Sequence, residues 1–266
     1  MTPNRFSIII LLIILGVIAN GQNNDRWTAG SSKQLTGNVV NLVCFISTTE
    51  NPWDERNKVI ILKEIESSND WITDQSKYYN ISLNISNEVI DKEVVFDKIQ
   101  AGTGSGNERV DWIYQTMIKL GYRNSKQAYR KLLKKYSADN IQVIVIANEN
   151  GRPYSMRYAK GMNRKKYFME GLILYKNYDN GAKLPIEAVT SHELLHLYGA
   201  WDLYKTYAQS KDRERKAYEL YPNDIMVRVD HSTQNLNIDK LTAWLIGWNT
   251  IEPRDFEWFR PKDFLN

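Results

Sequence analysis

Two of the chain's three histidines lie four residues apart, at His192 and His196, and Glu193 follows the first of them directly. Residues at positions i and i+4 of a helix share one face, with their Cβ atoms about 5–6 Å apart. Two imidazole nitrogens in this arrangement can bind one metal ion at about 2.0–2.1 Å, and a glutamate beside the ion can act as acid and base without being a ligand. This is the arrangement of a catalytic zinc site, which keeps an open position for water.

A third ligand is expected shortly after the second histidine. Gly199 ends the helical pattern, because glycine takes a positive φ at little steric cost and lets the chain turn back. Asp202, three residues further on, then offers a carboxylate to the same ion. Three other residues remain alternatives for this position. They are Glu214 and Glu219, at the separation of a glutamate ligand on a later helix, and His231.

The segment HELLHLYGAWD resembles the extended zinc signature HExxHxxGxxH of the metzincin metallopeptidases, with aspartate in the last position. This variant is similar to that of snapalysin-like peptidases and of relatives of immune inhibitor A. The resemblance implies one zinc ion with three ligands, His192, His196 and Asp202. It also implies that Glu193 is the general base and that Met226, in the segment NDIM, forms a turn below the metal without being a ligand.

The resemblance is specific over residues 190–226 and shows two departures from the family pattern. Some metzincins have a tyrosine two residues after the methionine, where it helps to stabilise the transition state, whereas this chain has Arg228. An inhibitory prosegment is not evident either, because only a short polar segment precedes the first predicted strand, and Cys44 is badly placed for a latency switch.

The fold that the resemblance implies is an α+β fold of the metzincin-like zincin kind. Its parts are a mixed twisted sheet, a helix that carries the HExxH residues, and a small, mostly helical C-terminal subdomain after the glycine turn. We expect a single catalytic domain over residues 38–266, with an upper part over 38–199 and a lower part over 200–266.

Hydrophobic patterns predict the elements that position the motif. Continuous apolar runs predict strands over 39–46 and 141–148, the second at the centre of the sheet, and residues 166–175 predict a further strand at an edge. Helical spacing of apolar residues predicts helices over 53–76, 109–120, 125–136, 185–197 and 238–248.

Residues 1–21 have the pattern of a secretory signal peptide, because Arg5 precedes a long apolar run and small residues up to Gly21 precede the expected cleavage. The run is shorter than the roughly 17–25 apolar residues of a membrane-spanning helix. We therefore expect a secreted or periplasmic protein without a stable membrane anchor after cleavage. A polar lead segment over 22–37 follows, and we expect it to be loosely ordered.

Composition limits the other classes of function. The formal charge of +4 is spread over 266 residues, and the dense basic runs RKLLKK and KDRERK are short and mixed with apolar or acidic residues. Such runs are typical of solvated helix faces, so no nucleic-acid partner is expected. Cys44 is the only cysteine and lies in an apolar run, which favours a small buried hydrophobic side chain over a catalytic thiol.

The sequence therefore predicts an exported zinc-dependent endopeptidase with one catalytic Zn²⁺ and a peptide or protein substrate. Glu193 is expected to take a proton from the attacking zinc-bound water while the ion polarises the scissile carbonyl. The substrate is expected to pair with the edge strand over 166–175. Tyr198, Trp201 and Tyr204 are candidates for the lining of the cleft, although aromatic residues near a helix end more often have a packing role. The alternative function is a non-catalytic exported binding or scaffold protein that keeps the zinc site.

Overall fold

The computed structural model describes residues 29–99, 111–206, 209–228 and 230–260. The predicted signal peptide, residues 1–21, lies outside the described residues. Among the helices of the described part, none combines the length and the apolar character that crossing a bilayer requires.

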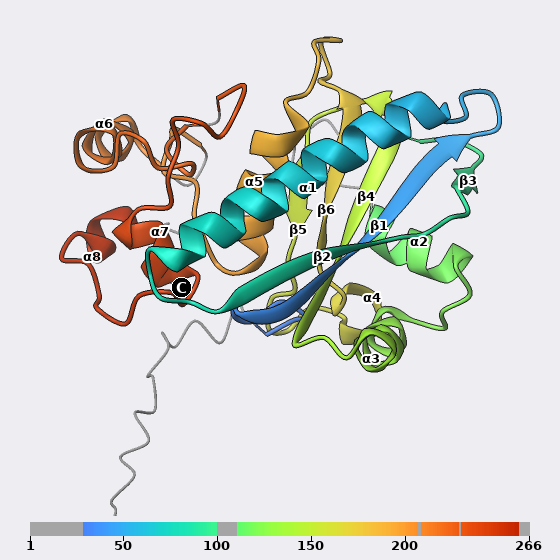
Figure 1. Ribbon diagram of the computed structural model, residues 1–266, viewed down its shortest axis with the longest axis horizontal. Helices are drawn as coiled ribbons and strands as arrows, with labels where there is room; N and C mark the ends of the chain where they lie inside the picture. The colour runs from blue at the N-terminus through green and yellow to red at the C-terminus, as the bar shows by residue number, and fades with distance from the viewer. Residues whose placement is uncertain (1–28, 100–110, 207–208, 229, 261–266) are drawn as a thin grey trace, which may run out of the picture.

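A mixed sheet forms the centre of the fold (Figure 1). Its strands in the described part of the chain are β1 (Gly37–Thr48), β2 (Leu83–Val89), β3 (Val94–Phe96), β4 (Asn140–Asn150), β5 (Tyr154–Met156) and β6 (Gly171–Asn177). The strand order is β2-β1-β4-β6-β5, and β3 pairs with the end of β1. All pairs are parallel except β5 with β6, which is antiparallel. The predictions of a mixed sheet and of a central strand over 141–148 are confirmed.

Helices cover both faces of the sheet (Figure 1). On one face lie α1 (Glu55–Lys77) and α5 (Ile186–Leu197), which pack on each other, and on the other face lie α2 (Trp112–Lys119) and α3 (Ser125–Tyr136). Because neighbouring residues of a strand point to opposite faces, Val43 and Phe45 of β1 join the core of α1 and α5, whereas Leu42 and Cys44 join the core of α2 and α3. Burial raises the pKa of the Cys44 thiol to about 12, which agrees with a packing role.

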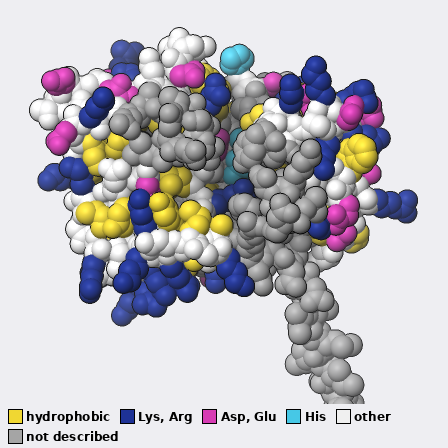
Figure 2. Space-filling model, turned by 180° about the vertical axis from the view of Figure 1, so that it is seen from behind, with side chains coloured by type: hydrophobic (Ala, Val, Ile, Leu, Met, Phe, Trp, Pro, Cys, Tyr) yellow, Lys and Arg dark blue, Asp and Glu magenta, His cyan; other side chains and the backbone are white. Residues whose placement is uncertain are grey.

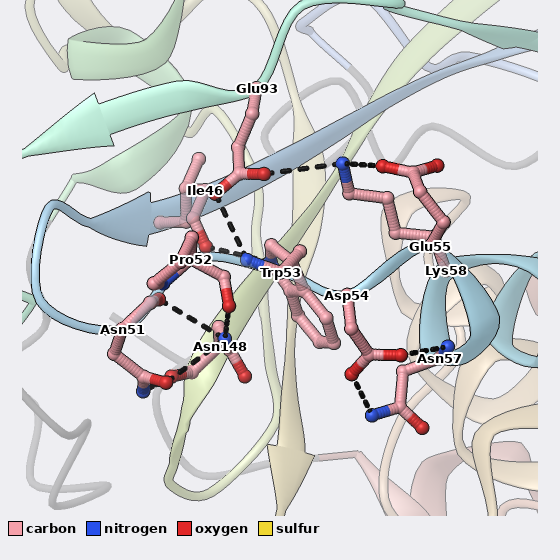
Figure 3. Close-up of polar contacts among 10 residues, drawn as sticks. All are labelled: Ile46, Asn51, Pro52, Trp53, Asp54, Glu55, Asn57, Lys58, Glu93 and Asn148. Carbon is pink, nitrogen blue, oxygen red and sulfur yellow. Dashed lines mark hydrogen bonds and ion pairs between the residues drawn. The ribbon is translucent and has the colours of Figure 1, made fainter.

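The turn that leads into α1 is held by specific polar contacts (Figure 3). Asp54 caps the helix, because its side chain accepts a hydrogen bond of 2.9 Å from the backbone N–H of Asn57. The indole Nε1 of Trp53 donates to the backbone carbonyl of Ile46 at 2.9 Å. These contacts set the direction in which α1 leaves β1, and α1 in turn supports α5.

The strand predicted over 166–175 is confirmed only in its second half, and its predicted edge position is wrong. Within residues 166–175, the first residues belong to the short helix α4 (Arg164–Tyr167), and β6 begins only at Gly171. β6 lies between β4 and β5 and is therefore not an edge strand. The edge strand next to β6 is β5, whose three residues are too few to produce a recognisable alternation of apolar and polar residues.

The chain after α5 has three short helices, α6 (Lys211–Leu220), α7 (Lys240–Leu245) and α8 (Phe256–Phe259), joined by longer turns and loops, so the expectation of a mostly helical C-terminal part is wrong for the described residues. These helices lie together at one side of the sheet, on the left in Figure 1. Their aromatic side chains extend the core of α1 and α5. The rings of Trp244 and Phe256 meet edge to face with their centroids 4.3 Å apart.

Residues 29–36, the first described part of the predicted lead segment, are packed against the rest of the fold. Leu35 is fully buried, and its carbonyl accepts a hydrogen bond of 2.6 Å from Trp248 Nε1. The backbone N–H of Ser32 donates to Glu170 Oε2 at 2.7 Å. The expectation of loose order is therefore wrong for this part, because its polar backbone groups have buried partners.

Candidate metal centre

The helix α5 carries the HExxH residues and ends where the glycine predicts. Its last residue is Leu197, and Gly199 has φ of 109°, in the left-handed region that favours glycine. The backbone N–H of Ala200 then donates to the carbonyl of Leu195 at 3.2 Å. The chain thus folds back over the last turn of the helix and brings Asp202 to the two histidines.

Three side chains converge at the end of α5. Asp202 Oδ1 lies 3.2 Å from His192 Nε2 and 3.1 Å from His196 Nε2, and the two Nε2 atoms are 3.1 Å apart. A tetrahedral ion with bonds of about 2.0–2.1 Å keeps its ligand atoms roughly 3.3–3.4 Å apart. The spacing is therefore close to that of three ligands around one ion. Among the described residues, no other group of three His, Cys, Asp or Glu side chains offers its ligand atoms so close together.

Backbone carbonyls orient both rings. His192 Nδ1 lies 3.1 Å from the carbonyl oxygen of Ile225, and His196 Nδ1 lies 2.9 Å from that of Ala200. In the neutral ring each Nδ1–H donates to its carbonyl, which leaves the Nε2 lone pair directed at the cluster. Asp202 Oδ1 is buried and accepts no hydrogen bond from the described residues. Three electron-pair donors that face one another repel unless a proton or a cation lies among them, so the cluster fits a metal ion.

The pKa values of the cluster also favour a positive charge among the three side chains. Burial opposes a positive charge on His192, but Asp202 and Glu193 outweigh it and raise the pKa of His192 to about 9. Burial also opposes the negative charge of Asp202, yet the two imidazoles hold the pKa of this carboxyl well below its usual range. A proton therefore competes with a metal ion for the cluster, and metal binding is expected to weaken as the pH falls.

A turn over residues 224–227 supports the cluster from below. The carbonyl of Ile225 holds His192, and the carbonyl of Met226 accepts a hydrogen bond of 2.7 Å from the backbone N–H of Leu203. The turn thus positions both the first histidine and the loop that carries the aspartate. Met226 is fully buried in this turn.

Glu193 lies beside the cluster and contacts the edge strand β5. Ser155 Oγ lies 2.6 Å from Glu193 Oε2 and 2.6 Å from the backbone carbonyl oxygen of Glu193. A hydroxyl has one proton, so it donates to one of these oxygens at a time. The sequence patterns did not identify Ser155, because its role depends on the short strand β5, which they did not predict.

A cavity of about 810 Å³ opens in front of the cluster. It is lined by His192, Glu193 and Tyr204, and also by Arg152 and Arg228. In Figure 2, cyan histidine atoms are visible in the hollow between the two halves of the surface. Ligand sites commonly have volumes of roughly 300–1,000 Å³, so a substrate has room to reach the cluster.

The three aromatic residues considered as candidates for the cleft lie in different places. Tyr204 lines the cavity, with its ring centroid 5.9 Å from that of His192. Tyr198 is fully buried and donates to Gln142 Oε1 at 2.8 Å, and Trp201 packs into the hydrophobic core. Of the two possible roles, packing therefore holds for Tyr198 and Trp201 and lining of the cleft for Tyr204, because the sequence pattern does not tell which side of the reversed chain faces the cavity.

The alternative third ligands do not join the cluster. Glu214 lines the cavity, but its Oε1 accepts a hydrogen bond of 3.0 Å from the backbone N–H of Lys205. Glu219 and His231 are exposed. Within the described residues, Asp202 is the carboxylate that meets both imidazoles.

Comparisons with known proteins give a distant structural likeness. No family model matches the chain, and none of the curated proteins matches it. Among solved structures, the chain is similar to metalloproteinase-II from Bacteroides fragilis, with 12% sequence identity, 87% of this chain covered and a TM-score of 0.42. The chain spans 59% of the length of that protein's chain. At this identity and TM-score the likeness carries no argument about function, which depends on the geometry of the cluster.

Proposed function

We propose that this protein is a zinc metallopeptidase that hydrolyses internal peptide bonds. The observation that supports the proposal is the convergence of His192, His196 and Asp202 next to an open cavity, which His192 and Glu193 line. Two imidazoles and one carboxylate form a donor set that suits a catalytic zinc ion, which keeps its fourth position for water or substrate. When bound, zinc would polarise the scissile carbonyl and make a water at the site more acidic.

Glu193 is the proposed general base. Two neutral imidazoles and one carboxylate leave a divalent ion with a formal charge of +1, whereas three histidines would leave +2, so water at this site is expected to be less acidic. A protein base is then needed all the more. Glu193 takes the proton of the attacking water and returns it to the departing amine. The support is that Glu193 lines the cavity and that Ser155 holds one of its carboxylate oxygens.

β5 is the proposed binding strand for the substrate, in place of residues 166–175. It lies at the edge of the sheet, and its residue Ser155 touches Glu193. Arg152 and Pro153, directly before β5, line the cavity. An extended peptide that adds to this edge would bring its backbone past the general base, since strand addition aligns a peptide through main-chain hydrogen bonds.

Export is proposed on the sequence pattern of residues 1–21, with the protein released or periplasmic. The proposed catalytic domain extends over residues 38–266.

The test is incubation of the purified protein with a mixed peptide library, with and without a metal chelator. We expect cleavage within peptides, its loss on chelation and its recovery when zinc is added back. Cleavage that survives complete removal of metal would contradict the proposal. A protein that binds one equivalent of zinc and cleaves no peptide would instead support the non-catalytic binding or scaffold function.

A further inference from the structure

The Lys and Arg residues are unevenly distributed along the chain. Residues 112–138 and 157–169 contain twelve of the 35 Lys and Arg residues and neither Asp nor Glu. The rest of the chain has 23 Lys and Arg against 31 acidic residues. The modest formal charge of +4 therefore conceals a strong separation of charge between these two segments and the remainder.

The fold brings these two segments together. The rings of Tyr129 on α3 and Phe168 directly after α4 have their centroids 5.1 Å apart, and the guanidinium of Arg164 lies over the Phe168 ring at 4.6 Å. Lys126 and Arg130, one turn apart, share one side of α3. We call six side chains on these two helices the basic face: Lys126, Arg130, Lys131, Lys134, Arg164 and Lys165.

No acidic side chain neutralises the basic face in the part of the chain that the structure describes, because every ion pair there involves other residues. The charge of Arg164, with a smaller contribution from Arg130, lowers the pKa of Lys126. The cations are thus close enough to repel one another. A binding partner with negative charges would relieve this repulsion.

Aromatic and apolar side chains accompany these cations. Two further lysines of α3 and α4, which are not part of the basic face, have aromatic neighbours: Lys135 Nζ donates to the hydroxyl of Tyr136 at 2.7 Å, and Lys166 Nζ lies 5.0 Å from the ring centroid of Tyr167. Met162, just before α4, is 37% exposed. In Figure 2, Lys and Arg side chains line the lower edge of the surface, and hydrophobic side chains lie directly above them. Tyrosine and lysine suit a bilayer interface, because each has an apolar part that can be buried and a polar end that stays in water.

We propose that the basic face binds peripherally to a membrane surface that is rich in anionic phospholipids. The lysines and arginines would contact the headgroups, while exposed side chains such as Met162 would reach the boundary between headgroups and acyl chains. A nucleic acid would also be attracted by the charge, but it would gain little from an exposed methionine.

The position of the basic face is compatible with the proposed peptidase, although the membrane proposal does not depend on it. α3 lies on the face of the sheet opposite to α5, which carries the histidines (Figure 1). Binding through α3 and α4 would therefore leave the cavity open. This contact differs from a membrane anchor, because it requires neither a spanning helix nor a covalent lipid.

The test is sedimentation of the full chain with vesicles made of equal parts of phosphatidylcholine and phosphatidylglycerol, compared with vesicles of phosphatidylcholine alone. We expect binding to the first and none to the second, with binding weakened by salt. In one variant, glutamine replaces five exposed cations of the basic face: Arg130→Gln, Lys131→Gln, Lys134→Gln, Arg164→Gln and Lys165→Gln. This variant should bind at least roughly tenfold more weakly, because each Lys or Arg near an anionic surface contributes to affinity.

A matched control removes the same amount of charge elsewhere. It replaces five exposed cations that lie outside α3 and α4: Arg56→Gln, Lys63→Gln, Lys92→Gln, Lys211→Gln and Arg254→Gln. The control should bind like the original protein, and all three proteins should cleave a soluble peptide equally. Equal loss of binding in both variants would overturn the proposal, because net charge alone would then explain it. Binding to duplex DNA without binding to anionic vesicles would overturn it as well.

A measurement on the unaltered protein tests the same surface even if the variant does not fold. Lysines can be acetylated in solution with and without the anionic vesicles and then compared by mass spectrometry. Vesicles should protect Lys131, Lys134 and Lys165 but leave Lys63 and Lys92 reactive. Uniform protection, or protection of Lys63 and Lys92 alone, would contradict the proposed surface.

Discussion

Two acidic side chains, Asp202 and Glu170, are both largely removed from water but lie in opposite surroundings. Asp202 faces two imidazoles, which hold the pKa of its carboxyl well below its usual range although burial alone would raise it. Glu170 has no exposed surface, and burial raises the pKa of its carboxyl to about 8, because backbone hydrogen bonds and the charge of Arg157 do not offset the loss of solvation. The first surroundings keep an acid charged at neutral pH, and the second keep it mostly protonated.

The contacts of Glu170 explain its role. Its Oε2 accepts a hydrogen bond of 2.7 Å from Ser32 N, and its Oε1 accepts one of 2.6 Å from Tyr158 N. A Cβ atom added at Gly30 would lie 2.2 Å from Glu170 Cδ, so the N-terminal segment passes too close for any other residue. Donors surround this acid, whereas the Oδ1 of Asp202 faces two Nε2 atoms that are acceptors when the rings are neutral and donate only when the rings are protonated. The hydrogen-bonded oxygens of Glu170 therefore hold the N-terminal segment in place. The acceptor atoms that face one another around Asp202 instead form a site that suits a cation.

The largest effect is expected for Glu193→Gln. Because glutamine cannot take a proton, turnover of a cleavable peptide should fall by about 10²–10⁴-fold. Zinc content and the free energy of unfolding should stay close to those of the original protein, since glutamine can still accept the hydrogen bond of Ser155. Metal analysis alongside the peptide assay checks both. Activity that survives the substitution would remove Glu193 from the chemistry.

Asp202→Ala tests whether the carboxylate of Asp202 is the third ligand of the metal ion beside the two histidines. Loss of one ligand should weaken zinc binding at least roughly a hundredfold, so moderate chelator concentrations should strip the variant. His231→Ala serves as the matched control and should keep its zinc. If the two results were exchanged, the proposed third ligand would be wrong.

Glu170→Gln tests whether burial keeps the carboxyl of Glu170 protonated, by its effect on how stability depends on pH. The pKa of Glu170 rises from an ordinary 4.5 to about 8 in the folded protein. Between these values the unfolded chain releases a proton that the folded chain keeps, so rising pH favours unfolding by up to roughly 1.4 kcal/mol per pH unit. The original protein should therefore lose stability across this window relative to the variant, and denaturant unfolding curves below and above it measure the difference. Parallel stability profiles would show that Glu170 ionises normally.

The smallest effect is expected for Ser155→Ala. Removing a hydrogen bond to a charged group costs roughly 1.5–3 kcal/mol, and the part of it that aligns Glu193 should lower kcat by about tenfold with little change in KM. Zinc content should not change. Ser155→Thr keeps the hydroxyl and should restore most of the activity. A threonine variant as slow as the alanine variant would reduce the contact to packing.

Local sequence was enough for the residues that lie on one regular element. The spacing of His192 and His196 placed both rings on one face of α5, and Gly199 marked the end of that helix. The apolar runs identified β1 and β4 for the same reason, since burial on both faces of a sheet needs an unbroken run. These features follow from the period of the helix or strand and from the steric freedom of glycine. Both depend only on residues that are close together in the sequence.

Other features depended on which distant segments meet. Ser155 reaches Glu193 only because β5 adds to the edge of β6, and Tyr198 turns into the core while Tyr204 faces the cavity. The basic face likewise arises because two segments without acidic residues pack side by side. Periodicity within one element contains no information about such pairings, because they are set by the free energy of burying whole faces against each other. The placement of side chains on one helix was therefore readable from the sequence, whereas the supporting contacts and the charged surface were decided by the packed fold.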